Sequence, residues 1–154
     1  MKVTNLIQNI GKCRDLLSKK NFKSILKNIY LFKTVCKEVA RHTDKYILDN
    51  SYELDFTYND LQELSDEILN YIRNYQSKFT FKRFKEEILK NEIINDKVLT
   101  EFQKEKCNYM YVDRELREVY KILSYLALSV YLFEEQNIRK DFTFQVVDAI
   151  RSFI

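Results

Sequence analysis

The sequence predicts an all-α fold: a compact bundle of six or seven helices around an apolar helix near residues 114–135. Among 154 residues there is one Gly and no Pro, so the tight turns of β-hairpins have almost no residues to form them. Apolar residues recur at alternating steps of three and four, the period of an amphipathic helix. No linker or low-complexity tract divides the chain, so we predict a single helical domain over residues 1–154.

Two helices are expected in the N-terminal third. The first covers about residues 3–19, where apolar residues recur at helical spacing. Asn21 can cap a second helix, which we expect to run from Phe22 to about Asp49 and to measure roughly 40 Å at 1.5 Å per residue. The apolar series of this second helix is the most regular in the chain and consists of Phe22, Ile25, Ile29, Phe32, Cys36 and Val39.

A recurring Phe-Thr-aromatic tripeptide marks three further helix starts, at residues 56–58, 79–81 and 142–144. In each, Thr can accept a hydrogen bond from a free backbone N–H, while the preceding Phe packs on the fifth residue after it. We therefore expect one helix to about Ser77, one to about Asn91 with Phe81, Phe84 and Ile88 on its apolar face, and a last one after Thr143.

The remaining segment is expected to hold two helices. Asn95 or Asp96 can cap a short helix that ends near Cys107, and Asp113 can cap the central apolar helix. In this central helix Tyr120–Phe133 is the longest apolar stretch of the chain. About 18 apolar residues are needed to cross a bilayer, so we predict a buried core helix and no membrane segment.

Several kinds of chemistry are disfavoured by residue usage. Gly-rich phosphate loops need several glycines, and the chain has only Gly11. His42 is the only histidine and stands in a polar stretch, so we expect a solvated side chain and neither a His-based metal cluster nor a catalytic triad. Cys13, Cys36 and Cys107 are odd in number and never paired as Cys-x-x-Cys, which favours buried thiols in a reducing cytoplasm. We predict no catalytic residue, metal or cofactor, and no enzymatic activity.

The charge distribution is the most informative feature of the sequence. Residues 1–50 hold 11 Lys and Arg against 4 acidic residues, although the net charge of the chain is only +3. On the second helix, basic residues and one tyrosine fall within an arc of about 80°, away from the apolar series. We call this set the basic face and take it as the candidate site for a partner or a nucleic acid; it consists of Lys19, Lys23, Lys27, Tyr30, Lys37, Arg41 and Lys45.

Three interpretations of the basic face stay open at this point. Lysines with an interleaved aromatic suit phosphate contacts and base stacking. An acidic protein surface is a second possible partner, because its charge is opposite to that of the basic face. The third interpretation is a solvated face, or one neutralised within the chain by the acidic run at residues 53–67.

The leading hypothesis is a non-enzymatic intracellular helical protein that regulates or inhibits a partner protein, with self-association through the basic face as one form of it. The alternative is an RNA- or DNA-binding accessory protein that uses the same face. Residues with AT-rich codons dominate the composition, which favours a low-GC source such as a bacterium, its phages or a large DNA virus.

Two resemblances concern organisation only. The apolar helix at residues 116–133, followed by Asn137-Ile138-Arg139 and a short last helix, is similar to poxviral Bcl-2-like immune modulators, although the glycine usual in the centre of that fold is absent. The size and composition are similar to those of small helical phage inhibitors of bacterial defence systems. Both resemblances imply a protein that acts by binding, and neither supplies functional residues.

Overall fold

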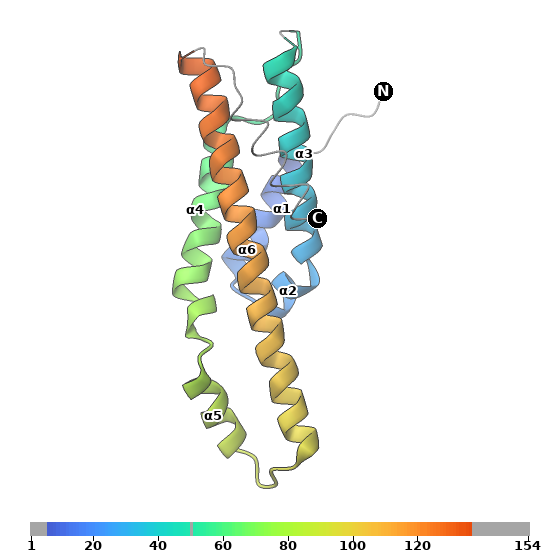
Figure 1. The fold of residues 1–154 in the computed structure, drawn as a ribbon, viewed down its shortest axis with the longest axis vertical. Coiled ribbons are helices and arrows are strands. Elements are labelled where there is room, and N and C mark those ends of the chain that lie inside the picture. The colour runs from blue at the N-terminus through green and yellow to red at the C-terminus, as the bar shows by residue number, and fades with distance from the viewer. Residues whose placement is uncertain (1–5, 50, 137–154) are drawn as a thin grey trace.

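The computed structural model describes residues 6–49 and 51–136, and this part of the chain is all-α, as predicted (Figure 1). It contains six α-helices, one short 3₁₀ helix and no strand. The predicted helix after Thr143 lies outside the described residues. The elements are α1 (Leu6–Lys19), α2 (Phe22–Lys27), α3 (Ile29–Leu48), α4 (Tyr58–Asn74), η1 (Gln76–Lys78), α5 (Phe81–Leu89) and α6 (Asp96–Gln136).

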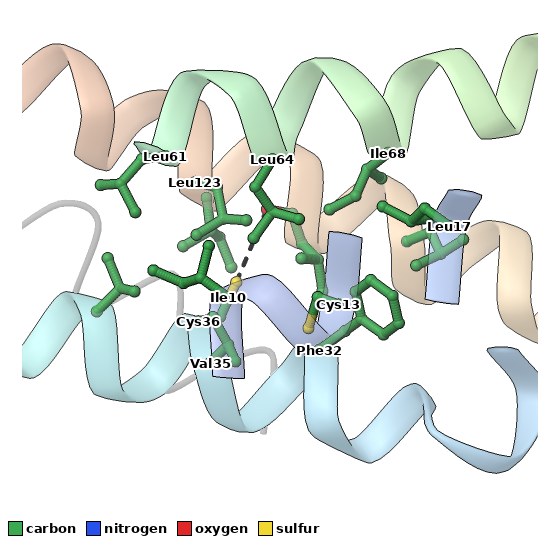
Figure 2. Close-up of a cluster of buried hydrophobic side chains, with 14 of the residues drawn as sticks. Ile10, Cys13, Leu17, Phe32, Val35, Cys36, Leu61, Leu64, Ile68 and Leu123 are labelled. Atoms are coloured by element: carbon green, nitrogen blue, oxygen red, sulfur yellow. Dashed lines mark hydrogen bonds between the residues drawn. The ribbon is translucent and has the colours of Figure 1, made fainter. Parts of the chain in front are cut away.

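The core of the bundle lies between α1, α3, α4 and α6. α6 packs along both α3 and α4, and α1 contacts the same two helices. Side chains such as Ile10, Phe32, Leu64 and Leu123 are completely or almost completely buried where these helices meet (Figure 2). The buried part of α6 runs from Val112 to Val130, which confirms the central apolar helix predicted near residues 114–135.

Ion pairs join helices around this core. Arg14 of α1 binds two carboxylates of α4: its guanidinium lies 3.1 Å from Glu63 and 2.7 Å from Glu67. Lys33 of α3 lies 3.8 Å from the buried Glu115 of α6. Part of the acidic run at residues 53–67 is therefore engaged by α1 and not by the basic face.

The helix starts follow the predicted capping residues. The Asn21 side chain accepts a hydrogen bond from the backbone of Ser24, and Thr80 caps α5 in the same way. At α4, Thr57 and Asp60 form a reciprocal capping box, in which each side chain accepts a hydrogen bond from the backbone of the other. These contacts are local in sequence, which explains why pattern alone located them.

The prediction of one continuous second helix is wrong, because the helix is interrupted at one residue. Asn28 separates α2 from α3, and the two helices follow different directions in Figure 1. The Asn28 side-chain amide donates to the carbonyl of Ser24 at 2.7 Å, and the Asn28 backbone N–H donates to the carbonyls of Ser24 and Ile25 at 3.1 Å. Asn28 therefore caps the end of α2 with both its side chain and its backbone. Side chains of this type compete with the backbone for helical partners, which accounts for a break that the apolar spacing did not reveal.

The predicted break before Asp113 is also wrong, because α6 is one helix of 41 residues. Instead of capping a new helix, the Asp113 carboxylate accepts a hydrogen bond from Arg117 at 2.9 Å, one turn further along. Asn95 caps the start of α6 by accepting from the backbone of Val98. Without Gly or Pro in this stretch, nothing in the backbone forces the helix to end.

Part of α6 extends past the bundle together with α5 (Figure 1). We call α5 and residues 96–111 of α6 the arm. The arm is joined to the bundle by a cluster of rings, in which Tyr109 stacks on Phe79 at 3.6 Å between centroids and contacts Phe22 and Phe84. Gln76 of η1 donates to the backbone carbonyl of Tyr109 at 2.6 Å. This junction fixes the position of α5 relative to α6.

We expect Thr57→Ala to lower the free energy of unfolding by about 1 kcal/mol, because it removes the side-chain oxygen that caps α4. Urea unfolding followed by circular dichroism measures the effect. Thr100→Ala is the matched control, since Thr100 lies exposed inside α6 and Ala is the better helix former there. Equal losses for both variants would contradict the capping role.

Candidate functional site

The structure distributes the predicted basic face over three helices. Lys19 ends α1, Lys23 and Lys27 belong to α2, and the rest belong to α3. The break at Asn28 therefore divides the single stripe expected on one helix. All seven predicted residues are exposed, and the four on α3, residues 30, 37, 41 and 45, share one side of that helix by their spacing.

Acidic neighbours reduce the positive charge of the basic face only in part. Lys19 pairs with Asp15 at 3.1 Å, and Arg41 pairs with Glu38 at 2.8 Å. By contrast, no ion-pair partner is found within residues 6–49 and 51–136 for the basic residues that remain on α2 or in the middle of α3, namely Lys23, Lys27 and Lys37. These three lysines are available to an anionic ligand.

The prediction of a solvated His42 is wrong, because only 8% of this residue is exposed. The connection between α3 and α4 places Tyr52 against it, and His42 Nδ1 shares a hydrogen bond with the Tyr52 hydroxyl. The other ring nitrogen, Nε2, lies 3.7 Å from the Glu38 carboxylate. His42 therefore helps to hold this connection on α3. In the described ranges, no group of three or more His, Cys, Asp and Glu residues could hold a metal ion.

A groove of about 470 Å³ lies between the two helices of the arm. Its volume falls in the range of ligand-binding pockets, and most of its lining is apolar. On the α5 side Phe81 is 74% exposed and Leu89 is 65% exposed, and on the α6 side Met110 is 62% exposed. The other lining residues are Phe84, Lys85, Ile88, Leu99, Phe102, Gln103, Lys106 and Cys107.

The apolar residues of α5 were expected to pack inward, and this is correct only for Phe84, which is buried. Phe81 is largely exposed and Ile88 is half-buried, because within the described ranges α5 packs mainly on one helix, α6. Reasoning from periodicity missed the groove for this reason. The available signal was the pair of apolar series at helical spacing, four residues on the short α5 and a second series at residues 99–110.

The three cysteines fall into two groups. Cys13 and Cys36 are fully buried in the core, as predicted, and burial raises the pKa of Cys13 to about 12 and that of Cys36 further in the same direction. The prediction of a buried thiol is wrong for Cys107, which is exposed and lines the groove. It lies in the part of α6 that extends past the bundle, where no helix among the described residues covers it.

The described part of α6 and the five other helices include no segment long and apolar enough to cross a membrane. The longest apolar stretch lies in α6, where it packs against α3 and α4. This agrees with its prediction as a core helix.

We expect one thiol per folded chain to react with a maleimide or an aromatic disulfide reagent, and all three to react in denaturant. The reason is that burial keeps Cys13 and Cys36 protonated and covered, whereas Cys107 is exposed. Mass spectrometry of the labelled chain gives the count. Cys107→Ser should remove the fast reaction, and fast labelling of either core cysteine in the folded chain would contradict this assignment.

Similarity to other proteins assigns no role to either surface. No family model matches the chain, and no curated protein or solved structure does so.

The basic face and the groove lie on different elements, so a variant can alter one and leave the other intact.

Proposed function

We propose that this chain is a non-enzymatic binding protein that regulates or inhibits a partner protein, and that the partner binds at the groove between α5 and α6. The observation that carries the proposal is the gathering of exposed apolar side chains at one place, above all Phe81, Leu89 and Met110. Contiguous exposed apolar surface of this kind is typical of interaction sites, whereas single exposed apolar residues are normal.

The position of the groove supports a binding role. No residue of α6 before Val112 is buried, and Phe84 is the only buried residue of α5. Neither stretch belongs to the buried core cluster, so the arm contributes little to the core of the bundle. The ring cluster around Tyr109 fixes α5 against α6. A partner would therefore meet a formed surface and would lose less free energy in ordering it.

The test is a comparison of two matched charge insertions, Leu89→Glu in the groove and Leu48→Glu outside it. Both leucines are 65% exposed and both are the last residue of their helix, so neither change should alter unfolding by more than about 0.5 kcal/mol. Tagged chains are purified from the cells that produce them, with and without nuclease. We expect Leu89→Glu to lower recovery of the bound protein at least about tenfold and Leu48→Glu to leave it unchanged.

Equal recovery with both variants would reject the groove as the contact surface. Turnover of a substrate that is lost on mutation of its binding residues would reject a purely binding role.

A second candidate function, nucleic-acid binding, is favoured by one observation: the exposed Lys23, Lys27 and Lys37 have no ion-pair partner in the described ranges. Tyr30 is exposed beside them in sequence and offers a ring for base stacking. The division of the basic face over three helices does not weaken this candidate, because phosphate contacts need charge and reach but no single straight helix.

If the second candidate holds, affinity for single- and double-stranded probes should fall steeply with salt, and each of Lys23→Glu and Lys37→Glu should reduce the slope of log K against log salt by about one. Fluorescence anisotropy over a salt series measures both. Lys97→Glu and Lys104→Glu, exposed positions on the arm, are controls that should leave the slope unchanged. Absence of binding at low salt would reject this function, and sedimentation of the same samples tests self-association through the basic face.

A further inference from the structure

The shape of the groove indicates what it can hold. Its two walls are helices, and on both walls the lining residues recur at helical spacing: 81, 84, 85, 88 and 89 on α5, and 99, 102, 103, 106, 107 and 110 on α6. At 1.5 Å per residue, each wall is roughly 12–17 Å long. A third helix of two to three turns has this length and presents apolar residues at i, i+3, i+4 and i+7, the pattern of helix-in-groove recognition.

The charges around the groove define the polarity of its occupant. Two of its lining residues, Lys85 and Lys106, are positively charged, and none is acidic. Two nearby carboxylates make contacts on their own helices: Glu87 pairs with Lys90 at 3.2 Å, and Glu105 accepts a hydrogen bond from Tyr109 at 3.2 Å. The charged residues at the rim of the groove, Lys85 and Lys106, are therefore both positive.

A smaller hollow of about 220 Å³ adjoins the groove and shares four of its residues, Phe81, Phe84, Lys106 and Met110. Asp113 also lines this hollow, but its carboxylate is paired with Arg117 at 2.9 Å. This acidic residue is thus paired with a cation of its own helix and does not face Lys85 or Lys106 as a free charge.

We propose that the groove binds an amphipathic helix of a partner protein, with apolar residues in the groove and acidic residues flanking them against Lys85 and Lys106. The inference rests on the proposed function and names the chemistry of the partner. A second copy of this chain fits less well, because a self-complementary contact through the groove places the same surface on both sides and so brings these lysines of both copies into one interface. Opposite charge at the rim favours the partner helix.

The test uses three fluorescent peptides of about twelve residues, each held helical by a side-chain cross-link. All carry Leu at i, i+3, i+4 and i+7, and their flanking positions are Glu, Gln or Lys. We expect the full chain to bind the Glu peptide most tightly and the Lys peptide most weakly, with a difference on the order of tenfold that shrinks as salt rises. Fluorescence anisotropy gives the three affinities.

Charge reversal at the rim should invert this order. In Lys85→Glu/Lys106→Glu the Lys peptide should become the tightest binder, while Lys23→Glu/Lys27→Glu, a matched reversal on α2, should keep the original order. Leu89→Glu should weaken all three peptides, because it places a charge in the apolar contact. Circular dichroism confirms that each variant is folded.

Three outcomes would overturn the inference, and each is distinct from failure of the proposed function. Equal affinity for the three peptides would reject an acidic partner while the groove remains a docking site. Absence of peptide binding, combined with loss of the cellular partner in Leu89→Glu, would reject a helix as the occupant. A dimer in sedimentation that Leu89→Glu dissociates would identify a second copy instead.

Discussion

The continuity of α6 determines the rest of this structure. At 1.5 Å per residue its 41 residues measure roughly 62 Å, whereas the 17 residues of α4 and the 20 of α3 measure only about 26 and 30 Å. The bundle can therefore enclose only part of α6. Residues from Val112 to Val130 contribute to the core, and the part before Val112 extends past the bundle beside α5, joined to the bundle by the rings around Tyr109. A groove follows, because two helices alone cannot cover each other's apolar sides.

The sequence predicted the features that depend on contacts between residues close together in the chain. Thr57, Thr80 and Asn21 act on backbone groups within three residues, so their capping roles could be identified from spacing. Whether Asn28 interrupts a helix or Asp113 starts one depends on which of several available hydrogen bonds the side chain makes. The exposure of Phe81 could not be predicted, because it depends on how far α6 extends beyond α4, a property of the assembled bundle.

The ion pairs of the bundle show why the net charge of a segment only partly predicts the charge of its exposed surface. Arg14 belongs to the basic N-terminal segment, yet it serves to join α1 to α4 through Glu63 and Glu67. Lys33 similarly faces the buried Glu115. What remains for a ligand is a smaller set centred on α2 and the middle of α3. The positive charge of the N-terminal segment that remains for binding is thus the charge that does not pair with another helix.

The arm and the bundle have different tolerances to change, and this difference favours a binding role at the groove. A substitution at Leu64 or Leu123 leaves a cavity among completely buried neighbours and costs about 2–5 kcal/mol for Leu→Ala. A substitution at Leu89 removes a side chain that is already mostly in solvent. Apolar residues that contribute little to folding stability still carry the cost of exposure to water, and contact with a partner would remove that cost.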